Sequence, residues 1–260
     1  MADVVLPMML ATSADVFLGD KITVRQPLSG YRAGIDAVLL AAVAQASADG
    51  RGRILDVGAG AGTVGLCVAA RLPAVDVVLV ERETTLAAIA RDNIQHNGFA
   101  ARMTLVEADI MQPLGEAAAN FLPAETFTHV LANPPYHDCA AGTVAEDALK
   151  AQSHAMPAGA LDQWARFMAR TAAPGGRATM IHKADALPQI LAAFTSRFGG
   201  LRIFPIFPRA GSSAIRVLVE GIKGSRAPAE LRTGLVLHGQ GQAFTSEANE
   251  ILRHGAALAL

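Results

Sequence analysis

The sequence has little of what several classes of protein depend on. It holds two cysteines, Cys67 and Cys139, which lie in different segments without the spacing of metal ligands, so a disulfide framework and a zinc site are not expected. No stretch approaches about 20 uninterrupted apolar residues, so no membrane span is expected. The N-terminus carries Asp3 and lacks a basic start before a long apolar run, which argues against a signal peptide. We therefore expect a cytoplasmic protein with reduced thiols.

A strong charge of either sign is also missing. The formal net charge is -1 and the isoelectric point is near 6.7, whereas a dedicated nucleic-acid binder is usually more basic. A local basic patch is compatible with these values. Residues 201–260 hold seven Lys and Arg against four Asp and Glu, and together with Lys21, Arg25 and Arg32 they can form a positive rim for phosphates. Ordinary surface charge is the competing explanation.

The chain has ample material for a folded core, since 52% of its residues are hydrophobic. Short apolar runs alternate with amphipathic segments through the middle of the chain, which predicts an α/β fold with a mostly parallel sheet covered on both faces. The predicted strands are Arg53–Val57, Asp76–Glu81, Met103–Val106, Thr128–Ala132 and Arg177–His182. The predicted helices are Ile35–Ala46, Thr63–Arg71, Thr84–Asn97, Leu161–Ala172 and Ala184–Arg197. Two later runs, Leu201–Phe207 and Ala214–Glu220, predict an antiparallel hairpin at a sheet edge.

A glycine-rich turn follows the first of these strands directly. In Asp56-Val57-Gly58-Ala59-Gly60-Ala61-Gly62, the glycines allow a tight turn and a close approach of the backbone to a ligand. The helix that follows adds free N–H donors. Gly60, Gly62 and Gly65 also match the G-x-G-x-x-G pattern of dinucleotide sites. The turn therefore predicts a nucleotide-type cofactor without deciding which one.

Acidic residues at three strand ends favour S-adenosylmethionine (SAM) over a dinucleotide. Asp56 is poorly placed beside a pyrophosphate but suits the cationic amino-acid part of SAM. Glu81 can accept hydrogen bonds from the ribose hydroxyls, and Asp109 can accept one from the adenine amine. The competing interpretation is that these acids are ordinary strand-end or helix-capping residues.

A second motif, Asn133-Pro134-Pro135-Tyr136, lies at the end of the fourth predicted strand. The two prolines stop the strand and restrict the path of the loop. Carboxyl ends of parallel strands line one crevice, so this loop and the glycine turn should face the same cleft. The Asn133 amide oxygen and the Pro134 carbonyl can accept hydrogen bonds from a planar amino group, and Tyr136 can stack on a flat substrate. A simple proline-rich turn is the alternative.

Together the two motifs resemble the class I SAM-dependent amino-methyltransferases. The segment 26–36 (QPLSGYRAGID) is similar to the N-terminal signature of the bacterial tRNA(Val) adenine-N6 methyltransferase family, and residues 208–219 are similar to its final hairpin. The resemblance covers most of residues 17–222. The glycine motif is shared by many methyltransferases, whereas N-P-P-Y is specific for amino-group methylation but not for one substrate.

The resemblance implies a Rossmann-like fold with a mostly parallel seven-stranded sheet, helices on both faces and a C-terminal antiparallel hairpin. It implies three parts: residues 1–50 as an extension and helix that pack on the cofactor site, residues 51–222 as the methyltransferase domain, and residues 223–260 as a C-terminal extension of the same globule. It implies a tRNA substrate, while monomer and homodimer stay open. The implied SAM contacts are Asp56, Gly58, Gly60, Gly62, Glu81, Asp109 and Arg32. The implied catalytic residues are Asn133, Pro134, Pro135 and Tyr136.

Some features leave the substrate open. His137-Asp138-Cys139 follow Tyr136 where the family pattern has an aromatic or small residue, which can enlarge or polarise the substrate pocket. A glutamine-amide protein methyltransferase shares the N-P-P-Y loop but carries a separate N-terminal helical domain, which about fifty residues do not supply. A small-molecule O- or N-methyltransferase suits the neutral isoelectric point. No metal is expected, because the sequence offers no cluster of acidic ligands. A non-enzymatic binding module is the remaining alternative.

Overall fold

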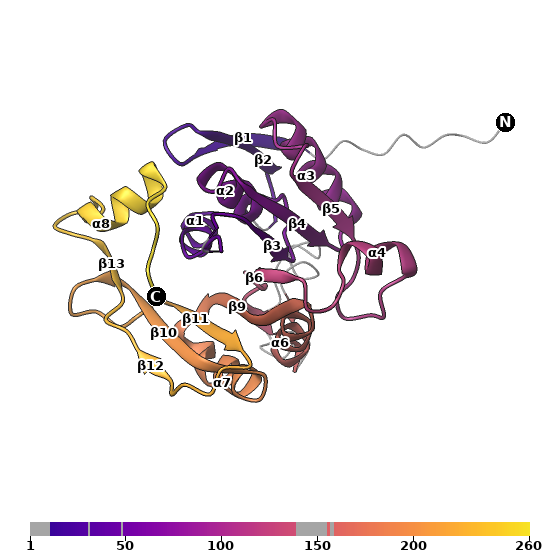
Figure 1. The fold of residues 1–260 in the computed structure, drawn as a ribbon. Coiled ribbons are helices and arrows are strands. Elements are labelled where there is room, and N and C mark those ends of the chain that lie inside the picture. The colour runs from indigo at the N-terminus through magenta and orange to yellow at the C-terminus, as the bar shows by residue number, and fades with distance from the viewer. Residues whose placement is uncertain (1–10, 31, 48, 139–154, 157–158) are drawn as a thin grey trace.

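The computed structural model describes residues 11–30, 32–47, 49–138, 155–156 and 159–260 (Figure 1). Cys139, which follows the predicted catalytic loop, and Tyr31 of the segment 26–36 lie outside these ranges. His137 and Asp138 form β7, which pairs in parallel with β8 (Ala155–Met156) next to the predicted catalytic loop. None of the described helices is long and apolar enough to cross a membrane.

A central sheet organises the described part of the chain, and its long strands run in the order β5-β4-β3-β6-β9-β11-β10. The pairs between neighbours from β5 to β9 are parallel, and β11 is antiparallel to both β9 and β10. The antiparallel hairpin predicted near the C-terminus is thus confirmed. The bounds of these strands are β3 (Gly52–Val57), β4 (Val75–Glu81), β5 (Met103–Glu107), β6 (Phe127–Ala132), β9 (Ala172–Lys183), β10 (Phe198–Arg209) and β11 (Arg216–Lys223).

Two short strands extend this sheet beyond the hairpin. Both β12 (Glu230–Leu231) and β13 (Leu235–His238) pair in parallel with the outer edge of β10. Within the described residues the sheet therefore has nine strands, of which seven form the order given above. The added strands cover an edge that would otherwise present unpaired backbone groups to water.

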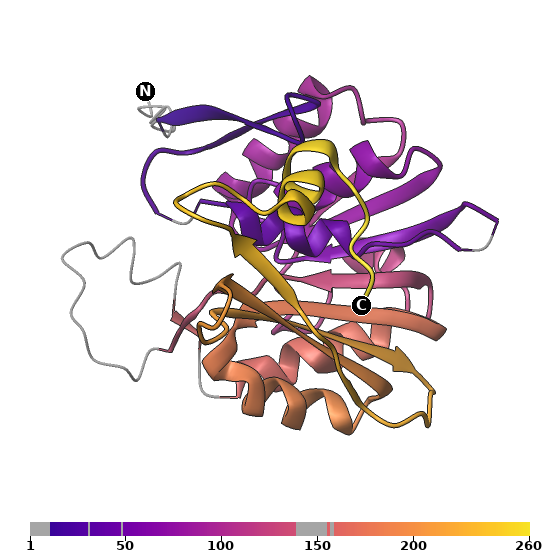
Figure 2. The same ribbon diagram turned by 90° about the vertical axis from the view of Figure 1, so that its left-hand side faces the viewer.

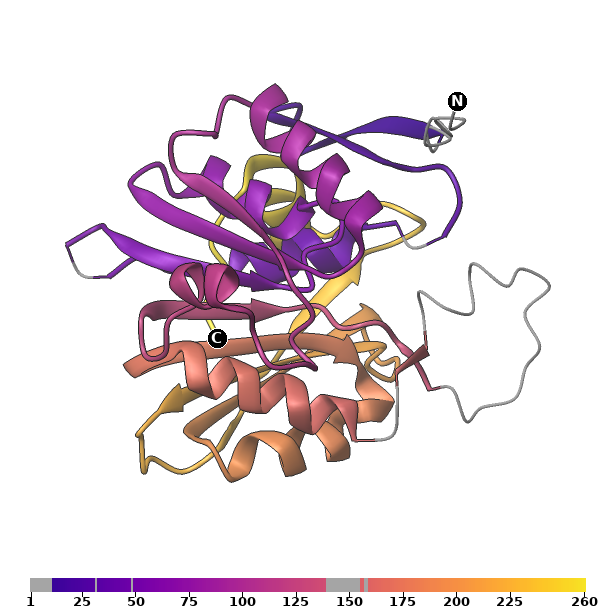
Figure 3. The same ribbon diagram turned by 90° about the vertical axis from the view of Figure 1, so that its right-hand side faces the viewer.

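Helices cover the sheet on both faces because its strands are apolar on both sides. Neighbouring residues of β3, Ile54 and Leu55, are both fully buried but belong to two separate core clusters. The first cluster packs against α1 (Ile35–Ala42), α2 (Thr63–Arg71) and α3 (Thr84–His96), and the second against α6 (Ala160–Thr171) and α7 (Leu187–Thr195). The two groups of helices lie on opposite sides of the sheet (Figures 2 and 3). A near-continuous apolar strand is typical of a doubly covered parallel sheet.

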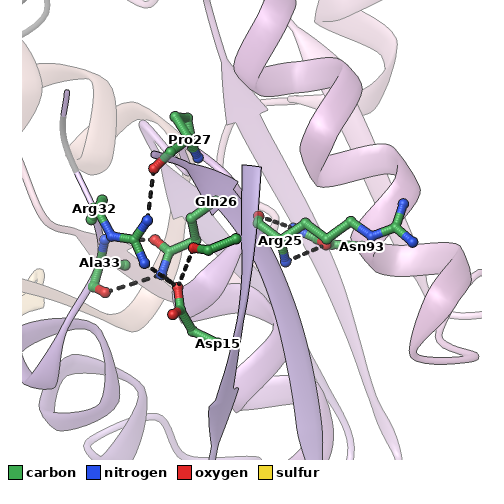
Figure 4. A network of polar contacts seen from close by, with 8 residues as sticks. Asp15, Arg25, Gln26, Pro27, Arg32, Ala33 and Asn93 are labelled. Atoms are coloured by element: carbon green, nitrogen blue, oxygen red, sulfur yellow. Dashed lines mark hydrogen bonds and ion pairs between the residues drawn. The ribbon is translucent and has the colours of Figure 1, made fainter. Parts of the chain in front are cut away.

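An N-terminal hairpin lies beside α3, and the sequence pattern did not predict it. Its strands are β1 (Thr12–Phe17) and β2 (Ile22–Pro27). Asn93 of α3 and Asn97, the C-cap of α3, bond the free edge of β2: Asn97 binds the N–H and carbonyl of Thr23, and Asn93 binds those of Arg25, at distances of 2.8 to 3.0 Å. The two side chains replace a neighbouring strand, and Figure 4 shows the contact of Asn93 with Arg25.

The C-terminal segment returns to the first group of helices. After β13, Thr245 caps α8 (Ser246–Asn249) by accepting a hydrogen bond from Ala248, and one turn of π-helix follows at Glu250–His254. Leu258 and Leu260 are buried in the first cluster, and the Leu258 N–H donates to the carbonyl of Ala42 at 2.9 Å. Short helices at Glu116–Phe121 (α4) and Ala184–Ala186 (η1) complete the described elements. The division of the chain into residues 1–50, 51–222 and 223–260, expected from the sequence, stays a prediction.

A buried carboxylate joins three strands of the sheet. Glu220 on β11 is 1% exposed, and its Oε1 accepts hydrogen bonds from Arg177 of β9 at 2.7 Å and from Arg202 of β10 at 3.1 Å. Its Oε2 lies 3.4 Å from the hydroxyl of Thr179, which in turn contacts the buried His129. A carboxylate at this depth requires such partners, because an unpaired buried charge is costly.

Replacing this carboxylate should therefore destabilise the fold. We expect Glu220→Gln to lower the free energy of unfolding by about 3 kcal/mol, because two arginines lose their charged partner inside the sheet. Urea denaturation of the wild type and the variant measures the difference. The matched control is Glu230→Gln, which breaks an exposed pair with Arg232 and should change stability by less than about 1 kcal/mol. Equal effects of the two substitutions would contradict a structural role for the cluster.

Candidate functional site

The glycine turn connects β3 to α2, and it is shaped by what lies on each side of it. Gly58 has a φ of +68°, and a Cβ atom there would come within 2.4 Å of the Trp164 ring on α6, so a side chain has no room. Gly60 has a φ of +57°, and a Cβ there would meet nothing within 4 Å. Gly62 is the N-cap of α2. The turn is thus packed against protein at Gly58 and faces open space at Gly60. The open space leaves room for a ligand to approach the backbone.

Asp56 supports the turn from inside. Its side chain is 1% exposed, and its Oδ2 accepts a hydrogen bond from the N–H of Gly65 in the first turn of α2 at 3.0 Å. Burial raises the pKa of Asp56 to about 7, although the Gly65 hydrogen bond opposes this shift. The structure shows this bond between strand and helix, and the predicted contact of Asp56 with the amino-acid part of SAM stays a prediction.

Glu81 links the glycine turn to the next helix. Its Oε2 accepts from the N–H of Gly60 at 2.8 Å, and its Oε1 accepts from the backbone N–H groups of Arg82 and Glu83, both at 2.8 Å. The residue is 7% exposed. A carboxylate has about four acceptor positions, so three backbone bonds leave capacity for a ligand hydroxyl. Its ribose contact also stays a prediction.

Asp109 completes the row of acids at this edge of the sheet. Strands β3, β4 and β5 are neighbours, with Glu81 in register with Glu107, so their carboxyl ends meet along one edge. Asp109 follows β5, is partly exposed, and accepts from the N–H of Met111 at 2.9 Å. The structure therefore brings Asp56, Glu81 and Asp109 to consecutive strand ends, in the order in which the sequence predicted them.

These groups fit the adenosine and amino-acid parts of SAM. The open space over Gly60 gives the backbone approach that such a ligand needs, and the acids offer acceptors for its hydroxyl and amine groups. The hydroxyl of Thr63, at the start of α2, is buried without a hydrogen-bond partner in the described structure, so a polar group remains to be satisfied beside the turn.

The Asn133-Pro134-Pro135-Tyr136 loop follows β6, next to the glycine turn. Because β6 pairs with β3 and Ala132 is opposite Val57, Asn133 leaves the sheet beside Gly58. The Tyr136 hydroxyl lies 2.7 Å from Asn133 Oδ1 and 2.9 Å from Asp36 Oδ2. One hydroxyl proton can be donated to only one of these oxygens at a time. The tyrosine therefore connects the loop to the first turn of α1.

Three further residues surround Tyr136, and sequence analysis gave none of them a role in the site. In the sequence Asp36 belonged only to the segment 26–36, and Arg216 only to the predicted hairpin. Arg216 Nε donates to Asp36 Oδ2 at 2.8 Å, and its guanidinium carbon lies 4.9 Å from the centre of the Tyr136 ring. The ring of His182, whose pKa is lowered by burial, meets Tyr136 edge-on at 4.9 Å. Both Asp36 and Arg216 belong to segments that carried the family resemblance. That resemblance was the feature of the sequence that could have pointed to them.

Arg32 lies in a separate network at the start of α1. Its guanidinium donates to the carbonyl of Pro27 at 2.9 Å and pairs with Asp15 at 2.6 Å, while the Gln26 amide bonds Asp15 and both backbone groups of Ala33 (Figure 4). The network orders the segment that precedes α1. Arg32 and Tyr136 line the same cavity, and contact of Arg32 with SAM stays a prediction. Among the described residues, no three His, Cys, Asp or Glu side chains are grouped as metal ligands.

Comparison with known proteins identifies the family to which the chain belongs. The family model of the methyltransferase small domain matches residues 33–162. A curated relative from Shewanella baltica, named tRNA1(Val) (adenine(37)-N6)-methyltransferase, is 30% identical over 192 residues, which are 73% of this chain and 76% of the relative. The chain belongs to the methyltransferase small domain family, and the predicted methyltransferase class and SAM cofactor are confirmed at the level of the family.

Two further proteins define the extent of the similarity. A relative of the same name from Shewanella loihica is 34% identical over 130 residues, so the match spans about half of each protein. A solved structure from Agrobacterium tumefaciens, described as a predicted O-methyltransferase, is 36% identical with a TM-score of 0.71 and covers 86% of this chain and 99% of that one. The predicted Rossmann-like methyltransferase fold is therefore confirmed.

The raised pKa of Asp56 gives a pH-dependent prediction. An unfolded aspartate ionises near pH 4, whereas Asp56 in the folded chain ionises near pH 7, so between these values the folded chain binds one more proton. Stability should therefore decline as pH rises from about 4 to about 7. Asp56→Asn does not ionise, and we expect it to gain roughly 2–4 kcal/mol relative to the wild type over this window. Urea denaturation at pH 4.5 and pH 8 measures the change, and a difference independent of pH would contradict the assignment.

Proposed function

We propose that this protein transfers the methyl group of SAM to a planar amino nitrogen, namely N6 of an adenine in tRNA. The observation that carries the proposal is the pairing of β6 with β3, which sets the Asn133–Tyr136 loop beside the glycine turn. The turn supplies the site for the methyl donor, and the loop supplies acceptors for the amino group. The names of the relatives from Shewanella support adenine N6 in tRNA as the substrate.

The cofactor would be held by the row of strand-end residues. Gly58, Gly60 and Gly62 would let the backbone pass under its methionine part, Asp56 would face its ammonium group, Glu81 would bind the ribose hydroxyls, and Asp109 would bind the adenine amine. Bound SAM supplies an electrophilic methyl group on a sulfonium. The residues of this chain then have to bring a weak nucleophile into line with it, which is catalysis by positioning.

The contacts of Tyr136 bear on how Asn133 would accept a hydrogen bond from the substrate. An aromatic amine is a poor nucleophile because its lone pair is delocalised, and hydrogen bonds from its N–H groups to Asn133 Oδ1 and the Pro134 carbonyl help to localise that pair. When Tyr136 donates its proton to the Asp36 carboxylate, that proton does not compete with the substrate amino group for Asn133 Oδ1. Donation to the Asp36 carboxylate is favoured over donation to the Asn133 amide, because hydrogen bonds to ionised groups are stronger than neutral ones.

An RNA substrate places a further demand on the site. The amino group of a stacked adenine cannot reach a loop at a sheet edge, so the base has to be unstacked or already lie in a single-stranded loop. The net charge of -1 means that phosphate contacts must come from local basic residues and not from the whole surface. The positive rim expected from residues 201–260 with Lys21, Arg25 and Arg32 remains a prediction.

One competing activity has an observation in its favour. The Agrobacterium tumefaciens structure is described as a predicted O-methyltransferase, which would suit a small-molecule hydroxyl substrate. Methyl transfer to a hydroxyl requires a base that removes its proton, whereas Asn133 and the Pro134 carbonyl are neutral acceptors. The composition of the loop therefore favours an amino nitrogen. A glutamine amide in a protein is the other planar nitrogen that the loop can serve.

Labelled SAM tests the substrate class directly. The purified protein is incubated with SAM carrying a labelled methyl group in separate reactions, each of which contains total tRNA, ribosomal RNA, release factors or a small-molecule extract. We expect label in tRNA, recovered as N6-methyladenosine after digestion to nucleosides. Label recovered in a protein band or in the small-molecule fraction would overturn the tRNA assignment.

Substitution of Asn133 tests the role of the loop. We expect Asn133→Ala to lower kcat by about 10²–10³-fold, the typical loss when one preorganised polar contact at a reacting group is removed. The dissociation constant of SAM, measured by isothermal titration calorimetry, should stay unchanged because Asn133 contacts the acceptor. Arg166→Gln, which breaks the exposed pair of Arg166 with Asp162 on α6, serves as the control. An unchanged kcat in the Asn133→Ala variant would show that the loop has no catalytic role.

A further inference from the structure

A cavity of about 340 Å³ lies against Tyr136, and we call it the outer pocket. Four segments build it: the residues at and just before the start of α1, the catalytic loop, the hairpin formed by β10 and β11, and β13 through Leu237. Its walls include Arg32, Ile35, Asp36, Tyr136, Ile215 and Arg216. Among the described lining residues Tyr136 alone comes from the Asn133–Tyr136 loop, and Asn133 and Pro134, the expected acceptors for the reacting amino group, are not among them.

Two apolar side chains in the walls of the outer pocket are exposed to solvent, while a third, Leu237, is buried. Ile35 is 37% exposed and Ile215 is 41% exposed, and they come from opposite ends of the chain, one on α1 and the other just before β11. Large exposed apolar side chains that gather around a cavity with polar groups are typical of a binding site. A ligand with flat apolar faces would cover both isoleucines.

The charged walls of the outer pocket are already neutralised. Arg216 pairs with Asp36 at 2.8 Å, and Arg32 pairs with Asp15 at 2.6 Å. A phosphate would have to compete with these carboxylates for the two guanidinium groups. A neutral heterocycle does not, because it can place its faces against the isoleucines and use its edge atoms for hydrogen bonds. Planar guanidinium groups and aromatic rings are common partners of unstacked RNA bases.

The size of the cavity limits the ligand further. Ligand pockets usually measure about 300–1,000 Å³, so a volume of about 340 Å³ suits one base and not a longer stretch of RNA. Because the described lining does not include Asn133 or Pro134, we assign a base bound here to a nucleotide next to the one that presents its amino group to Asn133. Such a contact would hold the target nucleotide in an unstacked position.

We propose that the outer pocket binds the base of a nucleotide that flanks the methylated adenine. This inference rests on the proposed RNA substrate and adds to it a second contact, outside the reacting groups. It makes Ile35 and Ile215 determinants of substrate binding, and it gives the hairpin between β10 and β11 a part in recognising the substrate.

Paired substitutions of the exposed isoleucines test the proposal. We expect Ile215→Ser, and likewise Ile35→Ser, to raise KM for an RNA hairpin substrate by about 5- to 30-fold, because the base loses the apolar surface that it would cover. The dissociation constant of SAM should not change. Leu231→Ser is the matched control, since Leu231 is 77% exposed on β12 and away from the pocket. An equal rise of KM in the Leu231 variant would overturn the proposal.

Abasic substrates identify the bound base. The nucleotides on either side of the target adenine are replaced singly by an abasic site, and each RNA is assayed with the wild type and with Ile215→Ser. One abasic RNA should show a raised KM with the wild type and no further rise with the variant, because base and side chain make the same contact. Independent, multiplying effects for both abasic RNAs would show that neither flanking base enters the pocket.

Direct binding separates this proposal from the proposed function. Fluorescence anisotropy of the labelled hairpin is measured with the wild type, Ile215→Ser and Leu231→Ser. If the wild type binds RNA without methylating it and Ile215→Ser weakens binding, the proposed reaction fails while the pocket stands. If RNA is methylated and the isoleucine variants bind as the wild type does, the pocket fails while the reaction stands. Absence of RNA binding by the wild type would overturn both.

Discussion

The site depends on the carboxylate of Asp36, which meets a side chain from each of two distant segments. It lies in the first turn of α1, accepts from Arg216 on β11, and is within hydrogen-bond distance of the Tyr136 hydroxyl. Its side chain is 16% exposed, and a charge so shielded from water is stable only with good partners. Those partners bring α1, the Asn133–Tyr136 loop and the C-terminal hairpin together.

Buried acids also stabilise the glycine turn, where the cofactor is expected to bind. Asp56 and Glu81 are buried, and their oxygens accept hydrogen bonds from the backbone of the glycine turn and of the helices that begin there. These bonds keep N–H groups oriented in a turn whose glycines would otherwise leave it free to move. Two of the residues predicted as ligands for SAM therefore stabilise the turn itself, and their contacts with SAM stay predictions.

The central helices and strands were predicted well from the sequence where their hydrophobic periodicity is strong. The helix at Thr63–Arg71 has the predicted bounds, and the strands from β3 to β6 begin and end within one residue of prediction. The predicted helix at Ile35–Ala46 ends earlier, at Ala42. The hairpin of β1 and β2 was missed, because β1 has an exposed, weakly apolar pattern and the edge of β2 is bonded by asparagine side chains of α3 instead of a strand.

Local pattern and spacing were enough to identify an α/β methyltransferase, its glycine turn, its strand-end acids and its Asn133–Tyr136 loop, since each of these motifs is contiguous or lies at the end of a periodic segment. The partners of Tyr136 could not be found in this way. Asp36 and Arg216 are 180 residues apart in the chain, and His182 lies on another strand. Their contacts depend on strand order and on the packing of α1 against the sheet, and neither of these leaves a periodic signal in the sequence.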